Sequence, residues 1–309
     1  MADFRLRTME PRDRAAVADL IYISINYWYQ THGHGALFSG GPGVTEVFYD
    51  VYEALDPGCG VVAESVRTGR LMGSCFYHPR EHHVSLGIMN VHPNYFGHGA
   101  ARAMLEFIIE FAERERKPLR LTQSAMNLDS YSLYTRAGFV PRQAYQDMVL
   151  AVPKDGLPHT TPGTDRVRPA TIDDVAAMGE LEMAVGGICR EKDYRYCIEN
   201  RDGFWQALVA EGDSGGLDGF LISCGHGAMN MLGPGVVRAQ EPAAALILRS
   251  LDAYRGRAPV FLVPVDCDRL VRQMYSWGAR NCELHFCQVR GEFRPFAGVN
   301  MPTFLPETG

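Results

Sequence analysis

The strongest constraint on the fold is that the chain repeats itself. The segment RLRTMEPRDRAAVADL matches RVRPATIDDVAAMGEL, with Arg5 against Arg166. Further along, VAESVRTGRLMG matches VAEGDSGGLDG, and LYTRAGF matches MYSWGAR with Gly138 against Gly278. Three matches in the same order predict a duplicated domain.

One segment separates the two predicted copies. Residues 152–165, VPKDGLPHTTPGTD, are rich in Pro, Gly, Thr and Asp, which is typical of a linker. A chain of 309 residues is long enough for two domains of about 150 residues each. We therefore expect a first domain over residues 1–151 and a second over residues 166–309. The separation between matched residues falls along the chain, which predicts that the second copy is shorter between its first helix and its second strand.

Hydrophobic periodicity predicts the elements of the first copy. The expected order is strand, helix, helix, three strands, helix, strand, short helix and closing strands, over residues 3–8, 12–29, 44–55, 60–66, 71–78, 83–91, 100–116, 119–125, 129–138 and 139–150. This order is typical of an α/β domain with a mixed sheet, of the α+β type. The predicted fold class is therefore a tandem of two such domains.

Composition and charge exclude several classes of protein. With 46% hydrophobic and 21% charged residues, the chain resembles an ordinary globular protein. The net charge of −6 and the lack of a basic cluster argue against nucleic-acid binding. Apolar runs such as LIYISINYWY are shorter than the roughly 20 residues that span a membrane, and the N-terminus is too charged for a signal peptide. We expect a cytoplasmic protein without a membrane partner, in which the eight cysteines are reduced.

A glycine-containing loop precedes the predicted helix at residue 100. In HPNYFGHGAARAML, Gly97 and Gly99 stand between an apolar strand and a helix with one buried face. The first backbone N–H groups of a helix, together with its dipole, form an anion site, and glycine lets the backbone approach a phosphate closely. A tight strand-to-helix turn also needs glycine, so the loop alone leaves both interpretations open.

Two motifs then point to a family. VHPNYFGHGAARAML resembles the acyl-CoA-binding motif of the GNAT N-acyltransferase superfamily, Arg/Gln-x-x-Gly-x-Gly/Ala, in which Gly99 and Ala101 match. Phe96 stands where the family usually has Arg or Gln. Further along the chain, NLDSYSLYTRAGF is similar to a second element of the family, with matches at Asn127, Leu133, Tyr134, Gly138 and Phe139.

This resemblance implies acetyl-CoA as cosubstrate. It implies that the fourth and fifth strands splay apart, and that the pantetheine arm inserts between them and bonds to backbone groups near Met89 and Val91. The cofactor-binding residues implied in the same way are Met89, Val91, Gly97, His98, Gly99, Ala100, Ala101, Asn127 and Tyr134.

Acyl transfer to an amine also needs groups that move protons. The resemblance implies Tyr134 as the acid that protonates the departing thiolate. Alternation along EHHVSLGIMNV puts Glu81, His83, Ser85, Gly87, Met89 and Val91 on one side of a strand, unless a bulge intervenes. Glu81 or His83 can then accept the proton of the ammonium group, directly or through water, although either residue can equally be a solvated turn residue.

No metal site is expected. The histidines of HPREHH and HGHG are close enough in sequence to suggest metal ligands, but that spacing on a strand or turn does not ensure a common face. They also have no acidic or cysteine partner at matching spacing.

The second copy differs from the first at its site. Alignment of Leu248 with Leu105 places Gln240 and Pro242 at the positions of Gly97 and Gly99, and Met274 takes the position of Tyr134. Proline has no N–H to offer a phosphate, so the second copy is predicted to be silent.

The function expected from these residues is N-acetyltransfer from acetyl-CoA to a primary amine of a small molecule, by direct attack in the N-terminal domain. The alternative is a non-catalytic acyl-CoA or metabolite-binding protein, or a scaffold. A monomer or a homodimer is expected.

Overall fold

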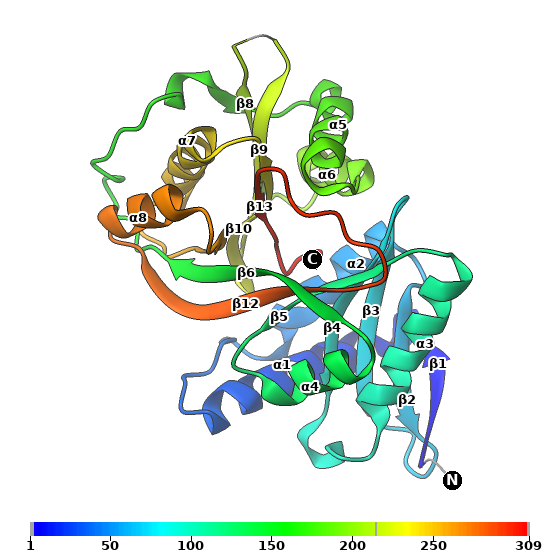
Figure 1. Ribbon diagram of the computed structural model, residues 1–309. Coiled ribbons are helices and arrows are strands. Elements are labelled where there is room, and N and C mark those ends of the chain that lie inside the picture. Colours follow the sequence, from blue (N-terminus) through cyan, green and yellow to red (C-terminus); the bar gives the residue numbers. More distant parts are fainter. Residues whose placement is uncertain (1–2, 214, 308–309) are drawn as a thin grey trace. The chain divides into compact units, whose positions relative to one another are not determined.

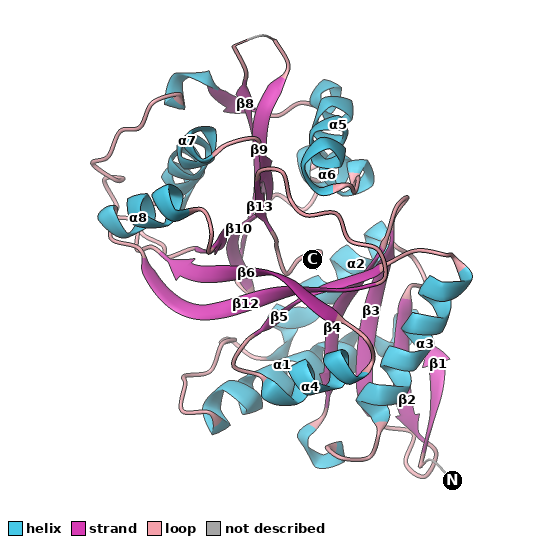
Figure 2. Ribbon diagram, viewed as in Figure 1, coloured by secondary structure: helices cyan, strands magenta, loops and turns pink. Residues whose placement is uncertain are grey.

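The structure is a computed structural model that describes residues 3–213 and 215–307. The chain divides into two compact units (Figure 1). Unit 1 contains residues 3–79, 83–119 and 304–307, and unit 2 contains residues 80–82 and 120–303. Both units combine strands and helices (Figure 2), as the α/β expectation requires.

Unit 1 is built on four antiparallel strands in the order β1 (Phe4–Thr8), β2 (Gly60–Ser65), β3 (Leu71–Pro79) and β4 (Val84–Val91). Its longer helices are α1 (Arg14–Thr31), α2 (Glu46–Leu55) and α3 (Ala100–Arg114). Helix α3 begins at the residue that the sequence predicts. It buries Met104, Leu105 and Ile108 on one face, so the glycine loop before it is held by a well-packed helix.

Unit 2 contains one mixed sheet of eight strands with a ninth paired to it. In sheet order the strands are β5 (Leu119–Ser124), β12 (Arg280–Arg290), β6 (Val140–Val149), β11 (Val260–Pro264), β10 (Met229–Val237), β9 (Leu217–His226), β8 (Trp205–Glu211) and β7 (Val167–Pro169), while β13 (Val299–Met301) pairs with β10. Its helices are α4 (Leu128–Arg136), α5 (Val175–Gly186), α6 (Glu191–Glu199), α7 (Gln240–Leu251) and α8 (Asp268–Ser276). Residue 119, the first of β5, is grouped with unit 1.

The two halves of the chain repeat one order of elements. From β1 to β6 the order is strand, helix, helix, three strands, helix, strand, helix, strand, and the same order runs from β7 to β12. The fold is therefore a tandem duplication.

An ion-pair cluster is repeated together with the elements. In the first copy the guanidinium of Arg7 pairs with Asp13 at 2.6 Å and with Glu64 at 2.6 Å. In the second copy the guanidinium of Arg168 pairs with Asp174 at 2.8 Å and with Glu211 at 2.7 Å. The residues of the two clusters align in the first two sequence matches. The sequence repeat therefore reflects a repeat of side-chain contacts.

The last strands of the two copies are exchanged. Strand β6 pairs with β11, with Val149 opposite Val260, and also with β12, with Ala144 opposite Phe286. On the other side of β12, the backbone N–H of Ala125 donates to the carbonyl of Leu284 at 2.8 Å. Residues 120–151 therefore pack in unit 2, although the sequence assigns them to the first copy. The compact units thus do not follow the expected boundaries 1–151 and 166–309, and those boundaries stay a prediction about the duplication.

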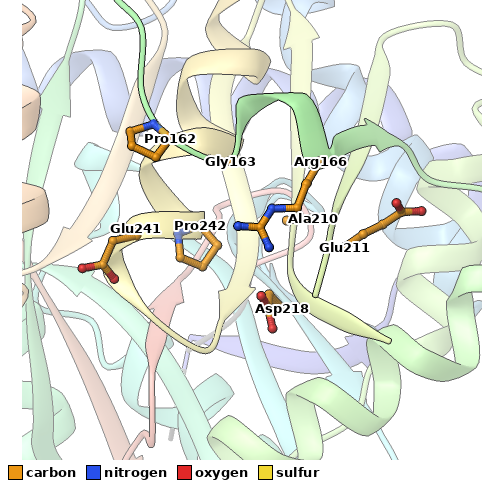
Figure 3. Close-up of a pocket in the computed structure, with 8 residues that line it drawn as sticks. All are labelled: Pro162, Gly163, Arg166, Ala210, Glu211, Asp218, Glu241 and Pro242. Atoms are coloured by element: carbon orange, nitrogen blue, oxygen red, sulfur yellow. The ribbon is translucent and has the colours of Figure 1, made fainter. Parts of the chain in front are cut away.

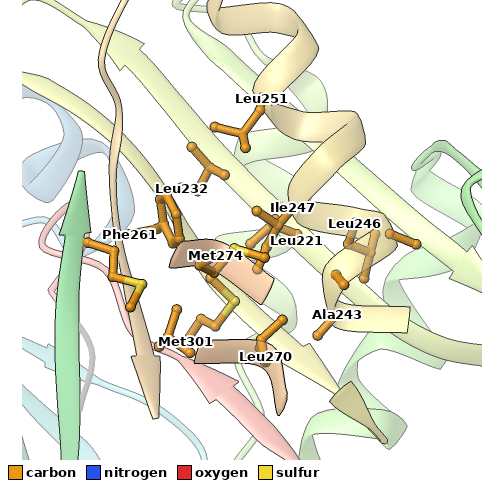
Figure 4. Close-up of a cluster of buried hydrophobic side chains, with 14 of the residues drawn as sticks. Leu221, Leu232, Ala243, Leu246, Ile247, Leu251, Phe261, Leu270, Met274 and Met301 are labelled. Atoms are coloured by element: carbon orange, nitrogen blue, oxygen red, sulfur yellow. The ribbon is translucent and has the colours of Figure 1, made fainter. Parts of the chain in front are cut away.

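The core of unit 2 lies between helices α7 and α8 and the sheet (Figure 4). Helix α7 contributes Leu246 and Ile247, helix α8 contributes Leu270, and β13 contributes Met301, each at most 1% exposed. Strand β13 is therefore an integral part of the core of this unit. No helix within residues 3–213 and 215–307 is both long and apolar enough to cross a membrane.

Candidate functional site

The glycine loop of unit 1 has the backbone geometry that the sequence suggests. Gly97 and Gly99 have φ values of 80° and 84°, in the left-handed region that favours glycine. A Cβ atom added at either residue would meet no atom within 4 Å, so the space beside the loop is open. Gly99 is the N-cap of α3, and because it has no side chain it does not cap the first N–H groups of the helix. The loop therefore offers the first turn of α3 to an anionic ligand.

The other loop residues differ in what they present to this space. His98 is exposed, Ala101 is half-buried and Ala100 is 1% exposed, with its side chain in the core. Ala100 can therefore contact a ligand only through its backbone. Phe96, which replaces the Arg or Gln of the motif, is 51% exposed and lies edge-on to Tyr27 with ring centroids 6.1 Å apart.

Strand β4 contains a bulge, which corrects one sequence prediction. Leu86 lies opposite Tyr77, whereas Met89 lies opposite Cys75, so two residues of β4 face one residue of β3. The bulge includes Gly87, where a Cβ atom would come within 2.8 Å of the His78 Nε2 atom.

The extra residue reverses the alternation of side chains along β4. The bulge is the exception for which the sequence prediction allowed, and residues 81 to 91 do not share one face. Ser85 and Met89 point to opposite faces, and Glu81 lies in a turn before the strand. Met89 and Val91 are both half-buried.

The two proton acceptors considered from the sequence lie in different surroundings. The Glu81 side chain is 76% exposed and lies 3.6 Å from the His82 imidazole, within the short segment grouped with unit 2. His83 is fully buried at the start of β4 in unit 1. Glu81 is thus a solvated turn residue in this structure, whereas His83 is part of the interior.

Asn127 and Tyr134 belong to α4 and its N-cap, in unit 2. The Asn127 side chain accepts a hydrogen bond from the backbone N–H of Ser130 at 3.0 Å, so it caps the helix. Tyr134 is 6% exposed and packs against Phe139, with ring centroids 5.7 Å apart. The turn closes when the N–H of Phe139 donates to the carbonyl of Tyr134 at 3.1 Å.

Sequence reasoning missed one carboxyl group of unit 1. Glu307 lies in the C-terminal segment, where burial raises the pKa of its carboxyl group well above the usual range. Backbone groups of Glu307 and of Ile88, on β4, hydrogen-bond to Tyr52. The Tyr52 hydroxyl also donates to the carbonyl of Phe304 at 3.1 Å. No local pattern in FLPETG indicates this position.

The second copy has the same strand bulge but fills the space beside it. In β10, Leu232 lies opposite Ser223 and Gly235 opposite Leu221, so the bulge recurs at the position that matches the bulge of β4. Strands β10 and β11 pair at only two positions, ending at Leu232. Beyond this point β13 pairs with Gly235–Val237 of β10. These three residues correspond to 89–91 of the first copy, so the chain itself occupies this edge of the second copy.

The second copy also lacks a long loop before α7. Helix α7 begins at Gln240 after the N-cap Ala239. Gln240 and Pro242 therefore lie inside the first helical turn, and their predicted alignment with Gly97 and Gly99 is wrong. The matched N-caps are Gly99 and Ala239. Only residues 238–239 connect β10 to α7, whereas residues 92–99 connect β4 to α3.

The structure supports the other alignment made from the sequence. In α8 the N–H of Ala279 donates to the carbonyl of Met274 at 3.0 Å, which reproduces the turn between Phe139 and Tyr134. Met274 is fully buried and therefore does occupy the position of Tyr134.

A small hollow of about 80 Å³ lies at the N-terminus of α7 (Figure 3). It is lined by Pro162, Gly163, Arg166, Ala210, Glu211, Asp218, Glu241 and Pro242. Arg166 is paired with Asp213, and the acidic side chains around the hollow oppose a phosphate group. This end of the second copy is therefore unsuited to the anion that the loop of the first copy can accept.

These features define a class of protein. A bulged strand, an open glycine loop and a helix N-terminus form a cradle suited to the pyrophosphate of a nucleotide-like ligand. Residues 24–139 match the model of the acetyltransferase (GNAT) family. Acyl transfer is thus the type of reaction to which the domain is related.

Solved structures resemble the whole chain. A putative acetyltransferase from Pyrococcus horikoshii covers 99% of this chain and 93% of its own, with a TM-score of 0.74 and 14% identity. A tandem GNAT protein from the clavulanic acid biosynthesis pathway covers 94% of this chain and 99% of its own, with a TM-score of 0.61 and 15% identity. At these identities the similarity establishes the fold, which is a tandem GNAT fold.

A curated relative matches a shorter part. The UPF0157 protein YqkA of Bacillus subtilis is 30% identical over 118 residues, which cover 37% of this chain and 33% of the relative. The match thus spans about a third of the length of that relative.

Proposed function

We propose that the protein is an N-acetyltransferase that moves the acetyl group of acetyl-CoA to a primary amine of a small molecule, with its active site in the first copy. The observation that carries this proposal is the contrast between the two loops. The loop before α3 has two glycines with positive φ and open space beside them, whereas acidic side chains surround the start of α7.

Backbone groups would supply most of the contacts to acetyl-CoA. The N–H groups of Gly97, Gly99, Ala100 and Ala101 suit the pyrophosphate, because they lie at or before the positive end of the α3 dipole. The N–H of His98 donates to the carbonyl of Tyr95 at 3.3 Å, so His98 would contribute through its exposed side chain. The backbone of Met89 and Val91, after the β4 bulge, suits the amides of the pantetheine arm. None of these contacts needs the Arg or Gln that Phe96 replaces.

The proposed chemistry is direct transfer. The lone pair of a neutral amine attacks the thioester carbonyl, the new C–N bond forms, and the C–S bond breaks with its electron pair on sulfur. Tyr134 is the proposed acid, which protonates the thiolate of CoA. The ammonium proton passes to a base, for which the proposed groups are His83, Glu81 and Glu307.

Among the proposed bases, Glu307 is distinguished by its surroundings. Burial raises the pKa of its carboxyl group well above the usual range, and a raised pKa makes the carboxylate a stronger base. Glu81 is the weakest candidate, because its side chain is 76% exposed. Water and conformational freedom would compete with a proton transfer there.

The second copy is proposed to be catalytically silent. Met274 replaces the acid, and β13 pairs along the edge of β10 that corresponds to the proposed pantetheine-binding edge of β4. The proposed partner is a small amine, with the protein as a monomer or homodimer in the cytoplasm and without a nucleic-acid or membrane partner.

One observation favours a second candidate function. Phe96 is 51% exposed and lies against Tyr27, so an aromatic pair stands at the loop in place of a polar side chain. A non-catalytic acyl-CoA or metabolite-binding protein, or a scaffold, would also tolerate this change.

Calorimetric titration of acetyl-CoA into the full chain, followed by an assay of free CoA thiol with a panel of primary amines, distinguishes these functions. The proposal expects one site per chain and amine-dependent thiol release. Binding without release from any amine would favour the binding protein. A chain that does not bind acetyl-CoA would contradict the proposed transferase and leave a metabolite-binding protein or a scaffold.

A further inference from the structure

Three ionisable side chains converge on the β6–β12 pair of unit 2. Asp147 on β6 lies directly opposite Glu283 on β12, and His285 follows two residues later on the same face of β12. All three side chains are buried, with exposures of 5%, 8% and 5% for Asp147, Glu283 and His285. Each residue can offer one ligand atom such that all three atoms lie within 4.8 Å of one another.

The exchange of the last strands creates this cluster. Asp147 comes from the first copy, whereas Glu283 and His285 come from the second. The cluster belongs to unit 2 and the glycine loop to unit 1, so the two sets of residues are distinct.

We propose that Asp147, Glu283 and His285 bind one divalent transition-metal ion, with Zn²⁺ as the best-suited ion. Carboxylate oxygen and imidazole nitrogen are ordinary ligands of zinc, and three protein ligands leave a fourth position for water or another molecule. This site does not depend on the proposed acyl transfer.

The distances suit such an ion. The His285 Nδ1 atom lies 3.5 Å from the Asp147 Oδ2 atom, and the Nε2 atom lies 3.9 Å from the Glu283 Oε1 atom. Bonds of about 2.0–2.2 Å to a tetrahedral ion place its ligand atoms about 3.3–3.6 Å apart. Small side-chain rotations would bring all three atoms into the coordination sphere.

The electrostatics of the cluster also favour a cation. The Asp147 Oδ1 atom is buried and has no hydrogen-bond partner within residues 3–213 and 215–307. An uncompensated buried carboxylate is costly, and a dication would remove that cost.

Two neighbouring polar groups bond elsewhere. The Cys282 thiol donates to the backbone carbonyl of Asp147 at 3.1 Å, so it bonds to the main chain rather than to the carboxylate. Tyr145, two residues from Asp147, accepts a hydrogen bond from the Asn300 amide at 3.1 Å.

The simplest alternative occupant of the cluster is a proton shared by the two carboxyl groups.

Zinc binding to the full chain tests the proposal. After treatment with a chelator, the wild-type protein should bind one Zn²⁺ per chain in competition with a chromophoric chelator. Asp147→Asn and His285→Gln should each weaken binding at least about 100-fold, since even residues that only orient metal ligands cost about 10–100-fold. His226→Gln, a half-buried histidine of β9 outside the cluster, is the control and should bind as the wild type does.

Thermal unfolding provides a second readout. Zn²⁺ should raise the midpoint of the wild type and of His226→Gln, because a ligand of the native state stabilises it, but not that of the two cluster variants. If a cluster variant fails to fold, Glu283→Gln takes its place in the same assays. Absence of stoichiometric zinc in the wild type would leave a shared proton as the explanation, and unchanged affinity in the cluster variants would place zinc elsewhere. Either result overturns the proposal.

Discussion

Strands β4 and β10 occupy the same place in the two copies and have diverged in what lies beside them. Both contain a bulge at a matched glycine, and both precede a helix at whose N-terminus a ligand can be expected. In the second copy β13 pairs with β10 directly after the bulge, and two residues suffice to reach α7. The first copy keeps a long open loop with two glycines at positive φ.

This difference separates the parts of the fold that maintain structure from those that serve a ligand. The bulge and the ion-pair cluster are present in both copies, so we interpret them as structural features of the domain. The open loop and Tyr134 are present in one copy alone. We therefore propose the ligand-binding and catalytic roles for these features, and the predictions below test that proposal.

The largest expected effect is that of Tyr134→Phe. Loss of a general acid typically costs about 10²–10⁴-fold in rate, so turnover of acetyl-CoA with an amine should fall by that factor while acetyl-CoA binding is retained. Steady-state kinetics and calorimetry measure the two effects separately. Met274→Leu is the matched variant at the equivalent buried position and should leave turnover unchanged. Equal losses in the two variants would remove the contrast between the copies.

Met301→Ala tests the strand that fills the second copy. Met301 is 1% exposed and belongs to the core of unit 2, so its truncation should lower the free energy of unfolding by about 2–5 kcal/mol. Chemical denaturation measures the loss. Calorimetry should still find one acetyl-CoA site per chain. A second site would indicate that β13 masks a cofactor site that still functions.

Gly99→Val should weaken the binding of acetyl-CoA about tenfold or more. Valine at a φ of 84° is strained by about 1–3 kcal/mol, and its side chain would enter the open space beside the loop. Ala239→Val is the matched control, because the N-cap of α7 has an extended conformation that valine adopts readily. Equal affinities of wild type and Gly99→Val for acetyl-CoA would exclude the loop as the binding site.

The smallest effects are expected for the repeated ion pairs. Asp13→Asn and Asp174→Asn should each lower the free energy of unfolding by about 1 kcal/mol or less, because the ion pairs are not fully buried and solvent weakens them. The pKa of each native carboxyl group is lowered. For Asp13, burial is the largest single influence and raises the pKa, but the hydrogen bonds and charge around it, with Arg7 first, outweigh burial.

The dependence on pH sharpens this test. The hydrogen bond to Arg168 lowers the pKa of Asp174 to about 2. A depressed pKa stabilises the folded state above the ordinary pKa of aspartate, near 3.9, and this contribution is lost as the pH falls towards 2. The stability difference between wild type and Asp174→Asn should therefore shrink between about pH 5 and pH 2. A difference that is constant over this range would mean that the carboxylate charge contributes nothing.

Local patterns predicted the parts of the fold that depend on nearby residues. The first two sequence matches correspond to real equivalences, since the ion-pair cluster of Arg7 recurs in the second copy around Arg168. The glycines at 97 and 99 indicated both a positive-φ turn and a helix start, and both are present.

Features that depend on pairing between distant strands were not predictable. The bulge of β4 shifts the faces of Ser85 and Met89 because of how β3 pairs with it, and no residue pattern within the strand reveals that shift. Asp147 and Glu283 become neighbours only through the pairing of β6 with β12. In the same way, the pairing of β13 with β10 and the burial of Glu307 depend on the path of the C-terminal segment.

The exchange of β6 and β12 also bears on how such a gene can change. A chain ending at residue 151 would carry β6 without β11 and β12, the strands that flank it in the sheet. A chain beginning at residue 166 would leave β11 without the strand that pairs with its outer edge. Neither half can be inherited alone without exposing sheet edges, which promote aggregation. Selection against aggregation alone would thus favour keeping the two copies in one chain.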